Sequence, residues 1–159
     1  MIRVLFVCWG NICRSPMAEF ILKDMVEKEG LSDQFLIASA ATSSEEIWNG
    51  KGNPVYPPAR QELAAHGISC QGKRAVQLCK ADYEKYDYII GMEQMNIRYI
   101  HRILGKDPEH KVSKLMSFTQ EGGDIADPWY SGDFHGVYGQ ISRGCKGLQD
   151  YLKEQKEIS

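Results

Sequence analysis

The stretch VCWGNICRSP at residues 7–16 decides the fold, because it joins an apolar, β-branched run to the start of a helical pattern. The run at residues 3–7 predicts a buried strand of a parallel sheet, with Cys8 at its carboxyl end. We expect Ser15 to cap the following helix, Pro16 to be its first residue and Gly30 to end it. The stretch is therefore a strand, a loop and a helix in direct succession.

The same alternation continues along the chain. Further strands are predicted at 35–38, 88–90 and 112–118, and further helices at 58–66, 95–104 and 134–152. Strands that alternate with helices predict an α/β fold, a single doubly wound domain that spans residues 1–159. Two long loops, 42–57 and 119–133, are rich in turn-forming residues, and loops of this length often carry function.

Composition argues against several classes of protein. The 19 basic and 21 acidic residues give a net charge of −2, so we expect no nucleic-acid partner. The apolar runs are too short for a signal peptide core or a membrane span, so we expect a cytoplasmic protein with no membrane partner. The five cysteines and four histidines show no ligand spacing, so we expect thiols, no metal and no cofactor.

Residues 8–15 lie where open α/β sheets bind ligands, between the carboxyl end of a strand and the start of a helix. Successive backbone N–H groups can surround phosphate or a similar anion there, and the helix dipole favours negative charge. Gly10 and Asn11 tolerate the unusual backbone angles that such a loop requires.

Cys8 and Arg14 make this loop a candidate reaction centre. A helix N-terminus and an arginine both lower the pKa of a thiol, so Cys8 is the expected nucleophile. The planar guanidinium of Arg14 can bind two phosphate oxygens at once. Ser15 can donate a hydrogen bond to the sulfur and help it leave a phosphoenzyme. Without a nearby nucleophile, such a loop would only bind phosphate.

A leaving group needs a proton, and Asp127 in the second long loop is the candidate acid. Pro128 stiffens this loop, while Trp129 and Tyr130 are expected to wall a slot that excludes water. Trp48 is a weaker candidate for the same wall. The expected phosphate- and substrate-binding residues are Trp9, Gly10, Asn11, Ile12, Cys13, Ser15, Trp129 and Tyr130.

The motif at 7–19 together with Asp127-Pro128-Trp129-Tyr130 resembles the low-molecular-weight protein tyrosine phosphatases, and intermediate stretches agree in order over the whole chain. The resemblance implies a four-stranded parallel sheet flanked by helices and an enzyme that hydrolyses phosphotyrosine in proteins through a phosphocysteine; we expect this enzyme to be a monomer. It implies Cys8 as nucleophile, Arg14 as phosphate binder and Asp127 as general acid, without a metal. Asn11, Ser15 and Ser39 match a network that holds the phosphate loop, but Gly72 stands where many relatives have a histidine.

Three alternatives remain open. A thiol-linked arsenate reductase of the same fold has a cysteine pair after the third strand, and residues 91–96 contain none. A phosphoarginine phosphatase has a threonine where this loop has Ile12. A non-catalytic phosphopeptide-binding module would not need Cys8, Arg14 and Asp127 together. A nucleotide-binding P-loop is excluded because its Gly-Lys-Ser/Thr ending is absent.

Overall fold

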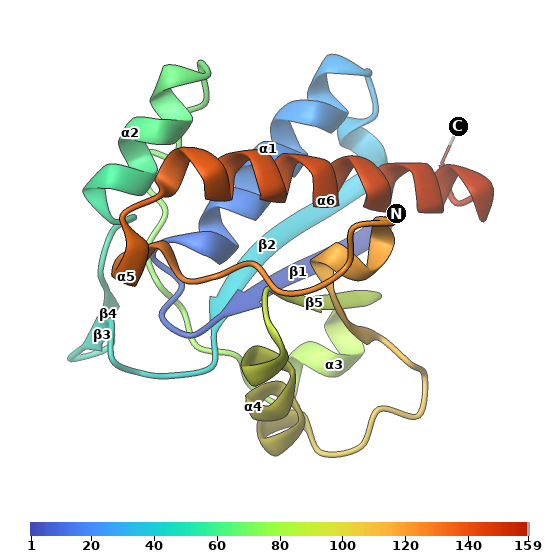
Figure 1. The fold of residues 1–159 in the computed structure, drawn as a ribbon. Coiled ribbons are helices and arrows are strands. Elements are labelled where there is room, and N and C mark those ends of the chain that lie inside the picture. The colour runs from blue at the N-terminus through green and yellow to red at the C-terminus, as the bar shows by residue number, and fades with distance from the viewer. Residues whose placement is uncertain (159) are drawn as a thin grey trace.

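A computed structural model describes residues 1–158, which fold around a parallel four-stranded sheet. The strands β1 (Ile2–Cys8), β2 (Phe35–Ala41), β5 (Tyr88–Gly91) and β6 (Val112–Lys114) lie in the order β2-β1-β5-β6 (Figure 1). Every neighbouring pair is parallel. The predicted four-stranded parallel sheet is therefore confirmed, and β1 has partners on both sides.

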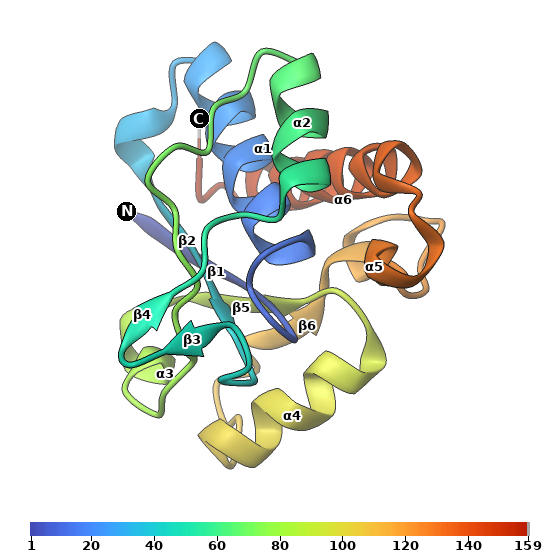
Figure 2. The same cartoon turned by 90° about the vertical axis from the view of Figure 1, so that its left-hand side faces the viewer.

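Helices cover both faces of this sheet, as a doubly wound fold requires. The helices α1 (Arg14–Lys28), α2 (Pro57–Ala65) and α6 (Phe134–Glu154) lie on one face, and α3 (Asp82–Lys85) and α4 (Gln94–Leu104) lie on the other (Figure 2). Side chains of β1 alternate between two apolar clusters: Val4 and Phe6 pack toward α1 and α6, and Leu5 and Val7 pack toward α4. Cys8 follows on the α1 side, which turns its thiol toward the start of that helix.

The start of α1 differs from the prediction. The helix begins at Arg14 after an N-cap at Cys13 that makes no side-chain hydrogen bond, so the expectations that Ser15 caps the helix and that Pro16 is its first residue were wrong. Ser15 lies inside the first turn, where its hydroxyl contacts the thiol of Cys8 instead of a backbone N–H. The end agrees with the prediction, since Gly30 follows the helix with a φ of 72°.

The predicted strand at 112–118 is only half correct. Its first three residues form β6, whereas Leu115–Phe118 form a 3₁₀ turn, η2. Leu115 and Met116 are both fully buried in the cluster on the α6 side. A strand would send two adjacent side chains to opposite faces, so burying both on one side favours the tight turn.

Both long loops contain short elements that were not predicted. The loop at 42–57 carries a hairpin of β3 (Ile47–Trp48) and β4 (Lys51–Gly52), and the loop at 119–133 carries the single-turn helix α5 (Pro128–Ser131). The four-residue helix α3 was also missed. Within residues 1–158, no helix is both long enough and apolar enough to cross a lipid bilayer.

The contact between α6 and η2 depends on a glycine. A Cβ added at Gly147 would lie 2.3 Å from the backbone oxygen of Phe118, whereas one at Gly139 would meet only the end of the Arg143 side chain, at 3.4 Å. We expect Gly147→Ala to lower the free energy of unfolding by about 1–3 kcal/mol through overpacking. The matched change Gly139→Ala should raise it by up to about 1 kcal/mol, because alanine favours helix. Chemical denaturation checks both, and stabilisation by both changes would contradict this packing.

Candidate active site

The carboxyl ends of β1, β2 and β5 meet at one edge of the sheet, and a cleft of about 800 Å³ opens there. The segments that follow these strands and the loop that carries α5 line this cleft. Its lining consists of Cys8, Trp9, Gly10, Ile12, Cys13, Arg14, Glu45, Glu46, Glu93, Met95, Asn96, Tyr99, Ala126, Asp127, Trp129, Tyr130 and Ser131. The structure thus brings Cys8, Arg14 and Asp127 together, although Asp127 is more than a hundred residues from the other two along the chain.

The loop between β1 and α1 is anchored through its carbonyl groups. The carbonyls of Cys8, Trp9 and Ile12 accept hydrogen bonds from the N–H groups of Thr42, Ser43 and Tyr56, at 2.9, 3.0 and 2.8 Å. The N–H groups of residues 10–13 donate to no backbone carbonyl in the described residues 1–158. Unpaired N–H groups before a helix N-terminus form a favourable site for an anion.

Asn11 fixes the shape of this loop. Its φ of 60° lies in the left-handed region, which asparagine tolerates better than most residues. Its buried side chain donates to Ser15 Oγ at 2.8 Å and accepts from the N–H of Val76 at 3.1 Å. Gly10 has no positive φ, so the expectation of unusual backbone angles holds for Asn11 and not for Gly10.

The thiol of Cys8 lies 3.0 Å from Ser15 Oγ. Because that hydroxyl oxygen already accepts from Asn11, its own proton is available to the sulfur, with only a longer contact of 3.5 Å to the carbonyl of Ala40 as competitor. Asn11, Ser15 and Cys8 are therefore one chain of hydrogen bonds that ends on the sulfur.

Cys13 lies in the same cleft but has different chemistry. The pKa of its thiol is raised to about 12, mainly by burial and to a smaller extent by electrostatic interaction with Cys8 and Asp127, while Arg14 opposes the shift. A thiol with this pKa is protonated at neutral pH and is a poor nucleophile. The five cysteines are all free thiols, as predicted.

The guanidinium of Arg14 is almost fully buried, with 2% of its side chain exposed. Its Nη1 donates to the carbonyl oxygen of Ile125 at 2.8 Å and lies 3.4 Å from Oε1 of Glu93. Its Nη2 lies 3.7 Å from Oδ2 of Asp127. Carboxylates on two different loops therefore compensate the buried charge and hold the guanidinium at the cleft.

Asp127 is positioned by the backbone around it. The N–H of Ile125 donates to the carbonyl of Met92 at 2.9 Å, which joins this loop to the end of β5. Asp127 is the N-cap of α5, and its Oδ1 accepts from the N–H of Trp129 at 3.0 Å. One carboxylate oxygen is thus held by the helix start, while Oδ2 faces Arg14.

Aromatic side chains flank the cleft on two sides. The indole of Trp9 donates to Glu45 at 2.6 Å and packs edge-on against Tyr99, while Trp129 packs against Tyr56 with ring centroids 4.7 Å apart. Trp129 and Tyr130 line the cleft, as expected, but they are 56% and 87% exposed, so the expectation that they exclude water from it is wrong for this structure. The weaker expectation for Trp48 was wrong: the side chain is 79% exposed at the tip of the β3–β4 hairpin and does not line the cleft.

Ser39 lies behind the loop and makes a different contact from the one expected. Its hydroxyl donates to the buried carboxylate of Glu19 at 2.5 Å and not to Asn11 or Ser15. The neighbour of Gly72, Lys73, donates to the carbonyl of Ser39 at 3.0 Å and lies 3.7 Å from Glu19. Burial lowers the pKa of Lys73, and the charge of Glu19 opposes this shift. A lysine and a glutamate thus occupy the side of the loop where the sequence suggested a missing histidine.

Sequence reasoning missed Glu93, which lies at the cleft in the segment 91–96 that was considered only for its lack of cysteine. Asn96 in the same segment accepts from the N–H groups of Met92 and Glu93, at 3.0 Å each. The available signal in the sequence was the spacing of Glu93 and Asn96, which suits a capping pair at the start of a helix. The segment holds an acidic partner for Arg14 where an arsenate reductase would need cysteines.

Comparison with known proteins agrees with this geometry. The family model described as low molecular weight phosphotyrosine protein phosphatase matches residues 3–158. YfkJ of Bacillus subtilis, named a low molecular weight protein-tyrosine-phosphatase, is 36% identical over 160 residues, 99% of this chain and 100% of that protein. Its crystal structure has a TM-score of 0.91 and covers 98% of this chain and 97% of that one.

Two animal proteins are also similar to this chain. A mouse low molecular weight phosphotyrosine protein phosphatase is 40% identical over 150 residues, 91% of this chain and 92% of that protein. The crystal structure of a drosophila arginine phosphatase is 31% identical with a TM-score of 0.84, and covers 96% of this chain and 98% of that one.

The role of Asn11 can be separated from the strain of its backbone. Asn49, at the exposed hairpin tip, has a similar φ of 50°. Asn11→Ala should lower the free energy of unfolding by about 2–4 kcal/mol, through the strain and the lost buried hydrogen bonds, against about 1 kcal/mol for Asn49→Ala. Asn11→Ala should also weaken binding of inorganic phosphate, measured by calorimetry. Equal effects of the two changes would show that the side-chain bonds of Asn11 do not hold the loop.

Proposed function

Because the chain belongs to the low molecular weight phosphotyrosine protein phosphatase family, as its sequence predicted, we propose that it is a hydrolase that removes phosphate from tyrosine in proteins. The observation that carries this proposal is the contact of the Cys8 sulfur with Ser15 Oγ at 3.0 Å, beside the buried guanidinium of Arg14. A nucleophile, an anion cradle and a fixed positive charge then face one cleft. We propose that residues 8–15 are its phosphate-binding loop.

The reaction proceeds in two displacements. The thiolate of Cys8 attacks phosphorus, the bond to the tyrosine oxygen breaks, and Arg14 with the loop N–H groups stabilises the charge on the three non-bridging oxygens. Asp127 gives its proton to the leaving phenolate oxygen. Water then attacks the phosphocysteine, Asp127 takes a proton from that water, and Cys8 leaves as a thiolate that accepts the hydrogen bond of Ser15.

We expect the whole chain 1–159 to act as one domain and as a monomer in the cytoplasm, on phosphotyrosine proteins and not on nucleic acids or membranes. The near-neutral net charge of −2 supports the exclusion of nucleic acid. The aromatic rings of Trp9, Trp129 and Tyr130 around the cleft support a flat phenyl substrate.

The decisive experiment compares two cysteine variants. Cys8→Ser should lose turnover of para-nitrophenyl phosphate by about 10³-fold or more, because a serine hydroxyl at this position is not ionised at neutral pH. Cys79→Ser changes an exposed thiol outside the cleft and should leave the rate unchanged. Turnover by Cys8→Ser at the wild-type rate would refute the proposed nucleophile.

Asp127 and Glu93 approach Arg14 at similar distances, 3.7 and 3.4 Å, so kinetics must decide which one is the acid. If Asp127 protonates the leaving group, Asp127→Asn should slow phenyl phosphates with a high leaving-group pKa by about 10²–10³-fold and activated ones far less. Glu93→Gln should slow all of them to a similar extent, because Glu93 contacts Arg14 and caps α4 without a role in protonating the leaving group. If Glu93→Gln instead shows the strong dependence on leaving-group pKa, and Asp127→Asn does not, then Glu93 is the general acid.

A second candidate function is the hydrolysis of phosphoarginine. The similarity to the drosophila arginine phosphatase favours it, and so do the carboxylates of Glu45, Glu46 and Glu93 at the cleft, which suit a guanidinium. Ile12 favours tyrosine, because its apolar side chain offers the guanidinium no hydrogen-bond acceptor.

The two substrates can be compared directly. We expect kcat/KM to be higher for phosphotyrosine peptides than for phosphoserine or phosphoarginine peptides, and Ile12→Thr to narrow the difference from phosphoarginine by about tenfold. A wild-type enzyme that prefers phosphoarginine would establish the second function, even if Cys8 is the nucleophile.

A further inference from the structure

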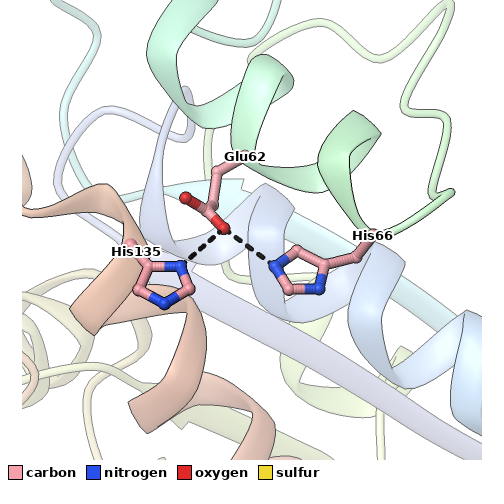
Figure 3. Close-up of side chains that lie close together, drawn as sticks. All are labelled: Glu62, His66 and His135. Carbon is pink, nitrogen blue, oxygen red and sulfur yellow. Dashed lines mark hydrogen bonds and ion pairs between the residues drawn. The ribbon is translucent and has the colours of Figure 1, made fainter.

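A cluster of two histidines and a glutamate lies outside the cleft, where α2 meets the start of α6 (Figure 3). Glu62 lies on α2, His66 is the C-cap residue four positions later, and His135 is the second residue of α6. Oε2 of Glu62 lies 2.8 Å from Nε2 of His66 and 3.1 Å from Nδ1 of His135. All three potential ligand atoms lie within 4.8 Å of one another.

These distances suit a small transition-metal ion. Zinc binds imidazole nitrogen and carboxylate oxygen at about 2.0–2.2 Å, so ligand atoms at the corners of a tetrahedral site lie about 3.3 Å apart. The two measured contacts of Glu62, 2.8 and 3.1 Å, are already close to that spacing. The nitrogens of His66 and His135 lie within 4.8 Å of each other, and the side chain of His135 is 82% exposed, so little packing opposes a rotation that brings them closer.

The surroundings prepare the ligands for binding. The His66 ring stacks on Tyr138, with centroids 3.7 Å apart and planes 5° apart, which fixes its orientation. The side chain of Glu62 is 15% exposed, so it is held in place by its surroundings more firmly than His135 is. The open side at His135 leaves room for a water as fourth ligand.

We propose that Glu62, His66 and His135 form a binding site for a divalent transition-metal ion of the zinc type, which links the end of α2 to the start of α6. Neutral imidazoles and one carboxylate are a ligand set that zinc accepts and that magnesium does not favour. His135 is close in sequence to α5 and lies eight residues after Asp127. In addition, Tyr56 at the start of α2 packs against Trp129 and Phe134, with centroids 4.7 and 5.9 Å apart. A bound ion therefore stabilises the base of the cleft wall.

Local sequence spacing did not predict this site, since His135 lies far from Glu62 along the chain. The pair Glu62 and His66 at positions i and i+4 was its only local signal. None of the three residues lines the cleft, so zinc binding at this site can be measured separately from the phosphatase reaction.

Zinc titration tests the proposal. The protein should carry no affinity tag and should carry Cys8→Ser, which removes a thiolate that would bind zinc in the cleft. Calorimetry should show one zinc ion bound per chain, cobalt should give the visible absorption of a site with nitrogen ligands, and zinc but not magnesium should raise Tm. Adding His135→Ala should weaken zinc binding by about tenfold or more and abolish the Tm shift.

His101→Ala is the matched control, since it removes an exposed histidine on α4. It should leave both the stoichiometry and the Tm shift unchanged. His135→Ala alters an exposed residue, so its own Tm without zinc shows whether the fold is intact. Absence of zinc binding, or binding that persists unchanged in His135→Ala, would overturn the proposal.

Discussion

The buried positive charge of Arg14 is the constraint on which the rest of the site depends. A guanidinium with 2% exposure is costly unless it is paired, and its partners come from separate parts of the chain: Glu93 after β5, and Ile125 and Asp127 in the loop before α5. The sheet order β2-β1-β5-β6 brings these segments beside the start of α1. The contacts that pair the buried guanidinium of Arg14 therefore also hold a positive charge at the candidate anion site. A bound phosphate would interact with this same charge.

The position of Cys8, the proposed nucleophile, follows from similar constraints. The strand alternation of β1 turns Cys8 toward α1, and Ser15 contacts the sulfur in place of capping the helix. The backbone of Asn11 lies in the left-handed region, and its side chain forms hydrogen bonds with Ser15 and with the backbone N–H of Val76. The loop thus leaves its N–H groups without backbone partners in the part of the chain that the structure describes, a local cost that is expected at a functional site.

Local patterns in the sequence predicted most of the fold, because strands and helices with strong periodicity determine their own type. Glycines at 30 and 105 marked helix ends, and the motif at 8–15 indicated the position of the site. Interactions between distant segments were not predictable. Leu115 and Met116 form a turn because α6 packs against both, Ser39 binds Glu19, and Glu93 reaches Arg14 only through the sheet. The candidate metal ligands Glu62 and His135 meet only because α2 and α6 pack together.

The central claim is that Cys8 carries the phosphoryl group during turnover. Rapid acid quench of the reaction with a phosphotyrosine peptide, followed by peptide mapping with mass spectrometry, measures this directly. The account predicts a phosphoryl group on the peptide that contains Cys8, at the thiol itself, which appears before free phosphate and then decays. A phosphoryl group on another residue, or turnover without any phosphorylated enzyme at the earliest times, would contradict it.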